Sequence, residues 1–199
     1  MPLTLLLVRH PETARAFAGR CIGQTDVPLS PDGERDCGRL ATEIVQFAPQ
    51  HLFSSDLERC RIVAENAAAQ LSLNFEASAQ WRELDFGTWE RQSWNSIAAS
   101  DAAHYESWSK DFVRLAPPEG ESFAHLSERI AWQLQKIISL RCERVAIVTH
   151  AGAMRAAMAL AIGLPPEQVF SIHLDYGATA ILQFEYERWA LVSLKNSAL

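Results

Sequence analysis

Two continuous apolar runs constrain the fold of this chain more than any other feature. Residues 3–8 read Leu-Thr-Leu-Leu-Leu-Val, and residues 144–149 read Arg-Val-Ala-Ile-Val-Thr. Short runs of this kind are typical of strands that are buried on both faces, as in a parallel sheet covered by helices. Parallel strands need long crossover connections, and the chain between the two runs supplies them.

Amphipathic helices are predicted between and after these strands. Ser30 and Pro31 form a typical helix start, with Ser as the N-cap and Pro at the first helical position. The spacing of apolar residues predicts helices over 31–47, 56–70, 122–140 and 152–162, short strands over 51–53 and 73–76, and a hairpin over 178–185 and 189–194. We therefore expect a three-layer α/β/α sandwich with a mainly parallel sheet.

The domain organisation expected from the 199 residues is a single domain, 1–199, with a small helical cap inserted at roughly 86–120. That segment concentrates aromatic residues and shows only weak helical periodicity. These aromatic residues either cover a site or fill a hydrophobic core. Aromatic side chains are more commonly found in a core.

The net charge and the cysteines limit which partners we expect the chain to have. The net charge of -6 argues against nucleic acid or an anionic membrane as a partner, so we expect a small molecule. The apolar stretch 145–164 is interrupted by His150 and Arg155 and is not a clean membrane span. The four cysteines lack metal-ligand spacing and fit reduced thiols in a cytoplasmic protein. A homodimer is left open.

Polar residues that follow the predicted strands mark the candidate site. His10 follows Arg9 at the end of the first strand, and His150 ends the later one just before a helix start. Ligands of open α/β sheets bind beyond the carboxyl ends of the strands, and a helix N-terminus favours anions. Arg59 can reach the same edge, or it can pair with Glu58 or Asp56 on the surface. Each histidine alone is more often structural, whereas their convergence with arginines predicts an anion site.

Short motifs along nearly the whole chain resemble those of the histidine phosphatase superfamily, the phosphoglycerate-mutase-like proteins. They occur in the order found in that family, at residues 7–13 (Leu-Val-Arg-His-Pro-Glu-Thr), 54–59, 83–90, 120–122 and 148–152. The resemblance implies that His10 is the nucleophile that takes the phosphoryl group as a phosphohistidine. It also implies a phosphate pocket of Arg9, Arg59 and His150, with Glu83 as the acid that protonates the leaving alcohol.

This division of labour is physically sensible. Phosphoryl transfer spreads charge over the equatorial oxygens, so catalysis is mostly positioning and positive charge, which two guanidinium groups and a histidine supply without a metal ion or cofactor. General acid help from Glu83 is worth roughly 10² to 10⁴ in rate if its carboxyl is held protonated. Without the motif, the better interpretation of Glu83 would be an ordinary surface carboxylate.

The chain departs from the family pattern at two places. Pro11 stands where the family usually has Gly, which removes one backbone donor near the phosphate. A family Asn is replaced within Ala14-Arg15-Ala16, where Arg15 is a candidate substitute. These departures keep a non-catalytic phosphate-binding module open as an alternative.

Within the superfamily, the chain looks most like the alpha-ribazole phosphatases. The supporting stretches are 21–30, 83–90, 108–112 and 117–123. The resemblance implies alpha-ribazole 5'-phosphate or adenosylcobalamin 5'-phosphate, in cobalamin biosynthesis, as substrate, and Ile22, Gly23 and Gln24 as substrate-binding residues. Trp89, Trp94 and Trp108 offer a flat surface for such a ligand, or they pack in a core. The alternatives are a phosphoglycerate mutase and a broad sugar-phosphate or fructose-bisphosphate phosphatase.

Overall fold

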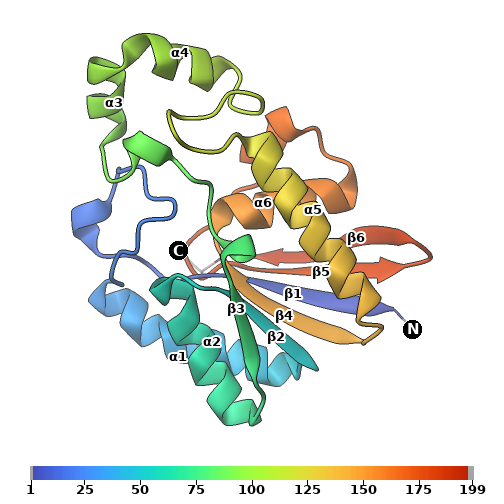
Figure 1. Cartoon of the computed structure of the whole chain (residues 1–199). Helices are drawn as coiled ribbons and strands as arrows, with labels where there is room; N and C mark the ends of the chain where they lie inside the picture. The colour runs from blue at the N-terminus through green and yellow to red at the C-terminus, as the bar shows by residue number, and fades with distance from the viewer. Residues whose placement is uncertain (1, 197–199) are drawn as a thin grey trace.

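A six-stranded sheet in the order β3-β2-β4-β1-β5-β6 organises the computed structural model, which describes residues 2–196 (Figure 1). The first four strands in this order pair in parallel, whereas β5 and β6 are antiparallel to their neighbours. The sheet is therefore mainly parallel, as predicted. The strands are β1 (Leu3–Arg9), β2 (His51–Ser55), β3 (Phe75–Ser78), β4 (Arg144–Thr149), β5 (Thr179–Glu185) and β6 (Arg188–Lys195).

Helices cover both faces of the sheet, which confirms the three-layer arrangement (Figure 1). Side chains along a strand alternate between the two faces. Leu6 and Val8 of β1 accordingly join the core beneath α1 (Pro31–Phe47) and α2 (Glu58–Leu71). Leu5 and Leu7 join the core beneath α5 (Phe123–Ser139) and α6 (Ala151–Ile162). The unbroken apolar run of β1 is thus explained by burial on both sides.

Helix starts follow the capping residues in the sequence. The Ser30 hydroxyl accepts a hydrogen bond from the Gly33 N–H at the start of α1, with Pro31 at the first helical position. Ser122 accepts a bond from the His125 N–H at the start of α5. The expected helix over 56–70 begins two positions later, at Glu58, and the expected strand over 73–76 is shifted to Phe75–Ser78.

The segment 86–120 lies beyond the carboxyl ends of the parallel strands, at the top of Figure 1. It carries η3 (Gly87–Trp89), α3 (Trp94–Ser100) and α4 (Ala102–Lys110) around a small core of its own, centred on Trp89 and Ile97. Cys21 belongs to this core, and its N–H and C=O bond the backbone at Gln92 and Arg91. The loop after β1 and the segment 86–120 are therefore joined above the sheet.

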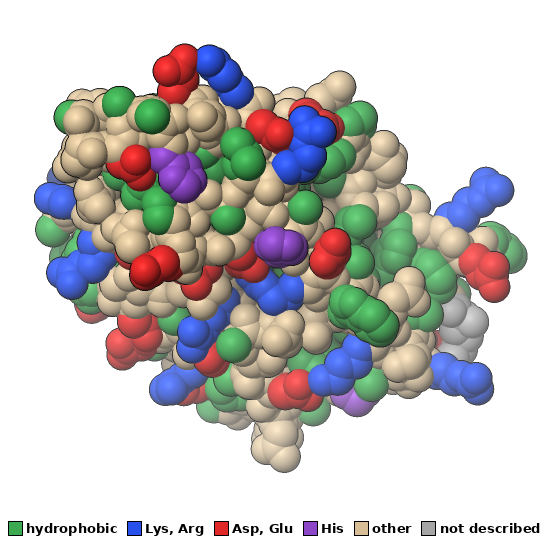
Figure 2. All heavy atoms as spheres, turned by 45° about the horizontal axis from the view of Figure 1, so that its top comes forward, with side chains coloured by type: hydrophobic (Ala, Val, Ile, Leu, Met, Phe, Trp, Pro, Cys, Tyr) green, Lys and Arg blue, Asp and Glu red, His purple; other side chains and the backbone are tan. Residues whose placement is uncertain are grey.

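The surface charges, the lengths of the helices and the state of the cysteines are relevant to the partners expected from the sequence. On the face shown in Figure 2, acidic and basic side chains are interspersed. Within residues 2–196, no helix combines the length and the apolar character that a membrane crossing requires. All four cysteines are free thiols.

Candidate active site

The carboxyl ends of β1, β2 and β4 bring the predicted residues together. Arg9 pairs with Thr149 in the parallel register of β1 and β4, and the His10 N–H donates to the Thr149 carbonyl at 3.0 Å. The ring centroids of His10 and His150 lie 5.1 Å apart. Arg59 enters from the first turn of α2, which follows β2. Positions far apart in the sequence thus meet because the parallel sheet aligns strand ends.

His10 has the tautomer and the charge of a nitrogen nucleophile. Its Nδ1 lies 2.7 Å from the Pro11 carbonyl oxygen, which can only accept, so Nδ1 carries the proton and Nε2 keeps its lone pair. Burial, assisted by the charges of Arg59 and Arg9, holds the pKa of His10 well below its ordinary value. The imidazole is therefore neutral near pH 7. Pro11 supplies the orienting carbonyl although it lacks an N–H.

Arg59 and His150 form a buried pair behind His10. Arg59 is only 1% exposed, so the alternative of a surface pair with Glu58 is wrong. Its Nε donates to Nδ1 of His150 at 3.3 Å, which leaves the proton on Nε2, 2.9 Å from the Ser55 hydroxyl. Burial and the neighbouring Arg59 charge hold the pKa of His150 well below its ordinary value.

Arg9 is largely desolvated and only partly bonded. Its Nη1 donates to the Leu174 carbonyl at 2.6 Å, and its guanidinium carbon lies 4.2 Å from the ring centroid of Tyr176. Burial lowers the pKa of Arg9. Its Nε is buried and finds no acceptor among the described residues. A buried guanidinium with spare donors favours a bound oxyanion.

Glu83 is held by two backbone N–H groups. Its Oε2 accepts from Gly152 at the start of α6, and its Oε1 accepts from Leu84, both at 2.9 Å. A Cβ at position 152 would overlap Oε1 of Glu83. Only glycine at 152 therefore allows this carboxylate position.

Two adjoining cavities surround these groups. A polar cavity of about 170 Å³ is lined by Arg9, His10, Thr13, Phe17, Gly19, Arg20, Ile22, Arg59, Glu83 and Tyr176. An aromatic cavity of about 210 Å³ is lined by Arg20, Ile22, Glu83, Leu84, Phe86, Trp94, Trp108, Phe112, Phe123, Leu126, Gly152, Arg155 and Phe170. Glu83, Ile22 and Arg20 belong to both, so the carboxylate stands where the two cavities meet.

The other predicted residues fall into different places. Ile22 lines both cavities, whereas Gly23 and Gln24 line neither. The Gly23 carbonyl accepts from Arg59 at 2.5 Å, and the Gln24 side chain contacts the Glu83 carbonyl at 3.4 Å. His150 also lies behind the polar cavity rather than in its wall.

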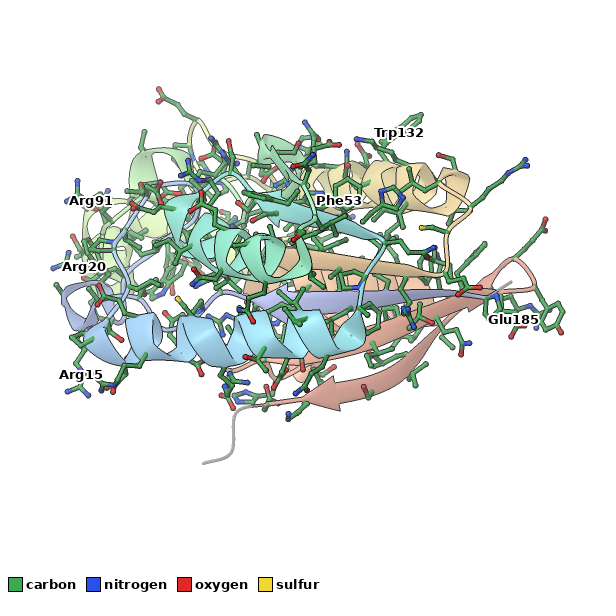
Figure 3. The ribbon with its side chains drawn as sticks, turned by 90° about the horizontal axis from the view of Figure 1, so that it is seen from below. Arg15, Arg20, Phe53, Arg91, Trp132 and Glu185 are labelled. Atoms are coloured by element: carbon green, nitrogen blue, oxygen red, sulfur yellow. The ribbon has the colours of Figure 1, made fainter. Side chains whose placement is uncertain are left out.

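Arg15, the candidate substitute for the family Asn, is exposed and lines neither cavity. Figure 3 shows it on the outside of the molecule, near the start of α1. Arg15 is therefore not placed to supply the expected compensation in either cavity. Among the described residues, no cluster of three or more His, Cys, Asp or Glu side chains is arranged to hold a metal ion.

The three tryptophans divide between the two readings offered by the sequence. Trp89 is 2% exposed and forms the core of the segment 86–120. Trp94 and Trp108 line the aromatic cavity, with their rings stacked at 5.8 Å and 12°. Only two of the three therefore offer a surface to a ligand.

Sequence reasoning missed several wall residues of the two cavities, among them Arg155 and Tyr176. Arg155 lines the aromatic cavity, and Tyr176 lines the polar one. Helical periodicity offers a signal for Arg155, because it stands three positions after Gly152 on α6 and so shares its face. Tyr176 lies in the loop before β5, where no periodic pattern points to it.

The chain is similar to known proteins along almost its whole length. The family model of the Histidine phosphatase superfamily (branch 1) matches residues 5–197. Adenosylcobalamin/alpha-ribazole phosphatase of Escherichia coli K12 is 24% identical over 98% of this chain and 96% of its own. A probable phosphoglycerate mutase GpmB of Klebsiella pneumoniae is 30% identical over 94% of this chain and 87% of its own.

Solved structures give the same picture. The crystal structure of the alpha-ribazole phosphatase from Shigella flexneri superposes with a TM-score of 0.89 at 25% identity, over 98% of this chain and 96% of that chain. The mycobacterial glucosyl-3-phosphoglycerate phosphatase shares the fold, with a TM-score of 0.88 at 22% identity over 99% of this chain and all of that chain.

Proposed function

Because the chain belongs to the histidine phosphatase superfamily and is a phosphatase, we propose that it hydrolyses phosphomonoesters through a phosphohistidine at His10, without a metal ion. One observation carries this proposal. His10 is neutral, with its Nδ1 proton committed to Pro11 and its Nε2 lone pair available, beside a cavity lined by Arg9, Arg59 and Glu83.

In the first step, Nε2 of His10 attacks phosphorus, the P–N bond forms and the P–O bond to the leaving alcohol breaks. Arg9 and Arg59 offset the negative charge on the equatorial oxygens. Glu83, in its protonated form, gives its proton to the leaving oxygen. A covalent intermediate splits one difficult displacement into two easier ones.

In the second step, water attacks the phosphohistidine. The Glu83 carboxylate accepts the proton of the water, the P–N bond breaks, and Nε2 of His10 regains its lone pair as inorganic phosphate forms. His150 contributes to the phosphate pocket through Arg59. Its Nδ1 accepts a hydrogen bond from the Arg59 Nε, while the Ser55 hydroxyl bonds its Nε2. The position of Glu83 on the Gly152 N–H suits both proton transfers because the carboxylate borders the leaving-group side.

The proposed substrate is alpha-ribazole 5'-phosphate or adenosylcobalamin 5'-phosphate, in cobalamin biosynthesis. The aromatic cavity supports this choice because it adjoins Glu83, the proposed proton donor to the leaving group. Flat apolar leaving groups gain from stacking and burial in such a cavity, whereas small polyhydroxy sugars leave its walls unmatched. The relative from Escherichia coli and the structure from Shigella flexneri carry names that match this substrate class.

A phosphoglycerate mutase is the second candidate, because relatives at 30% identity are named probable phosphoglycerate mutases. Such an enzyme returns the phosphoryl group from histidine to a second hydroxyl of the substrate. A broad sugar-phosphate phosphatase differs only in the substrates that it accepts. A non-catalytic phosphate-binding module would release no phosphate from any of them.

A substrate panel tests these candidates. Phosphate release is measured at equal concentrations of alpha-ribazole 5'-phosphate, fructose 1,6-bisphosphate, glucose 6-phosphate and 3-phosphoglycerate, with the 3-phosphoglycerate product also analysed for its isomer. We expect kcat/KM to be highest for alpha-ribazole 5'-phosphate by about tenfold or more, the range that a matched apolar pocket gives. Equal or lower rates contradict the substrate, isomer formation supports the mutase, and no release from any compound contradicts the phosphatase. Activity that EDTA removes and Mg²⁺ restores would contradict the metal-independent mechanism.

The remaining partner and location proposals are simple. We place the enzyme in the cytoplasm, as the four free thiols support. Its partner is the small phosphomonoester, with no nucleic acid and no membrane, and a homodimer stays open as its assembly. Cell fractionation and sedimentation of the purified protein test these points, and recovery in a membrane fraction would contradict them.

A further inference from the structure

Tyr176 contacts the groups that the proposed reaction depends on. Its ring centroid lies 4.2 Å from the Arg9 guanidinium carbon and 5.5 Å from the ring centroid of His10. Its hydroxyl lies 3.1 Å from the Thr13 hydroxyl. All four residues line the polar cavity. Tyr176 is therefore part of the wall of this cavity and touches the residues on either side of the nucleophile.

The backbone fixes Tyr176 relative to these partners. The Gly177 N–H donates to the His10 carbonyl at 3.1 Å, and the Arg9 N–H donates to the Ala178 carbonyl at 2.8 Å. The Leu174 carbonyl accepts from Nη1 of Arg9 at 2.6 Å. Gly177 adopts a φ of 68°, a backbone conformation that residues with a side chain rarely adopt. Glycine at this position therefore permits the turn that places the Tyr176 ring. The contact is thus set by paired backbone groups on both sides of the ring.

Arg9 needs such a contact. Its guanidinium is desolvated, which costs stability for a charge, and its Nε has no acceptor among the described residues. An aromatic face attracts a cation without using its N–H donors, so the ring can hold the guanidinium while the donors stay available to an oxyanion. Donors that are held in place before the substrate arrives need no reorganisation during the reaction.

Tyr176 also closes the polar cavity on one side. Tyr176 also lines an open hollow of about 540 Å³ between α1 and the C-terminal strands, together with Asp32, Asp36, Arg39 and Lys195. Tyr176 thus lines both the polar cavity and this hollow. We expect a smaller side chain at this position to open the polar cavity toward the hollow.

We propose that Tyr176 is a positioning residue that holds the Arg9 guanidinium in the orientation that binds the transferring phosphoryl group. The inference rests on the proposed function, since it assigns Arg9 to that group. The aromatic face carries the effect, and the bond to Thr13 is secondary.

Variants at position 176 separate these contributions. The affinity for inorganic phosphate is measured by calorimetry, and kcat and KM are measured with phenyl phosphate. Tyr176→Leu and Tyr176→Gln remove the aromatic face, and we expect phosphate binding to weaken about tenfold and kcat/KM to fall about 10- to 100-fold. Tyr176→Phe keeps the face and loses the hydroxyl, and we expect both quantities to stay within about threefold of the wild type.

A matched control is Tyr186→Leu, because Tyr186 is 87% exposed in the hairpin turn between β5 and β6. We expect it to bind phosphate like the wild type. Wild-type phosphate affinity in Tyr176→Leu and Tyr176→Gln, with melting temperatures that show both are folded, would overturn the inference. Equal damage in Tyr176→Phe would overturn it as well, because the hydroxyl would then carry the effect.

A double-mutant cycle tests whether Tyr176 acts through Arg9. In an Arg9→Met background, adding Tyr176→Leu should change phosphate affinity by less than about threefold, because the cation that the ring holds is gone. A further tenfold loss would contradict the proposed route through Arg9. Phosphate binding is measured without turnover, so the cycle stays informative even if no phosphomonoester is hydrolysed and the proposed function fails.

Discussion

The polar cavity and the aromatic cavity share Glu83, Ile22 and Arg20, but different parts of the fold supply their remaining walls. The polar cavity is built at the ends of parallel strands, where charged side chains are buried and bonded to backbone carbonyls. The aromatic cavity is built mostly from the segment 86–120, α5, α6 and η4 (Pro166–Ser171), and its aromatic rings meet in edge, tilted and stacked contacts. Charged groups that are held by the backbone can stabilise a transition state without moving. Apolar walls that adapt to a ligand can instead select which leaving group is bound.

The two regions should therefore respond differently to substitution. Arg59 alone bonds the carbonyls of Gly23 and Thr25 and the ring of His150, so losses in the polar cavity will not be additive. In the aromatic cavity, the neighbouring rings make no such network of hydrogen bonds within residues 2–196. Changes there should alter which esters are hydrolysed while the chemistry itself continues.

The largest effect is expected at the centre of the polar cavity. His10→Ala removes the proposed nucleophile, and we expect kcat to fall by about 10⁴ or more, with loss of acid-labile, base-stable phosphate trapped on the protein. His150→Ala should retain weak activity, because the lone pair of His10 remains. Rapid acid quench with a radiolabelled phosphomonoester measures both. Normal turnover by His10→Ala would show that another residue is the nucleophile.

The boundary between the cavities should show the next largest effect. Gly152→Ala places a Cβ where Oε1 of Glu83 lies, so the carboxylate must move. We expect kcat/KM, which reports the steps up to formation of the phosphohistidine, to fall about 10²-fold for esters of alkyl alcohols, which need a general acid, and much less for p-nitrophenyl phosphate, which does not.

Gly38→Ala is the matched control for this change, because an added Cβ at this position in α1 meets open space. It should leave both rates unchanged. If Gly152→Ala slows both esters equally, the role of Glu83 as proton donor is contradicted.

A selective effect is expected in the aromatic cavity. Trp94→Ala and Trp108→Ala remove stacked wall area beside the leaving group, and we expect kcat/KM for naphthyl phosphate to fall about tenfold while that for methyl phosphate stays unchanged. Trp132→Ala on the outer side of α5 is the control, because this ring is 76% exposed (Figure 3). Equal losses for both esters would mean that the rings only support the fold.

The smallest effect concerns pH and stability. Burial keeps His10 and His150 neutral in the folded chain, so the unfolded chain binds more protons below the ordinary histidine pKa of about 6.5. The free energy of unfolding should therefore fall as the pH drops below about 6.5, by up to about 1.4 kcal/mol per pH unit for each histidine until its folded pKa is reached. Above pH 7 this contribution is constant. Urea unfolding at several pH values measures it, and a His150→Asn variant with the same pH slope as the wild type would contradict this origin.

Much of the fold could be predicted because its causes are local. The continuous apolar runs of β1 and β4, the Ser30-Pro31 start of α1 and Gly163 at the end of α6 each depend on a few neighbouring positions. The meeting of His10 and His150 also followed from the sequence, since parallel strands end at one edge of the sheet. The motifs then indicated which family chemistry such an edge supports.

Other properties were decided by the tertiary structure. Trp89 and Trp108 look alike in the sequence, yet one fills a core and the other lines a cavity. The sequence is compatible with Arg59 on the exposed face of a helix. In the structure, Arg59 is buried and donates to Gly23, Thr25 and His150. Tyr176 and Gly152 gain their importance only from Arg9 and Glu83, which lie far away in the sequence.

The sequence by itself thus determined the layers, the edge that carries the site and the residue types that gather there. Only the tertiary structure decided the tautomer of His10, the burial of Arg59 and the division of aromatic rings between core and cavity. The physical reason is the range of the interactions. Helix capping and apolar periodicity act between near neighbours, whereas desolvation, cation–π contacts and steric exclusion depend on groups that folding brings together from distant positions.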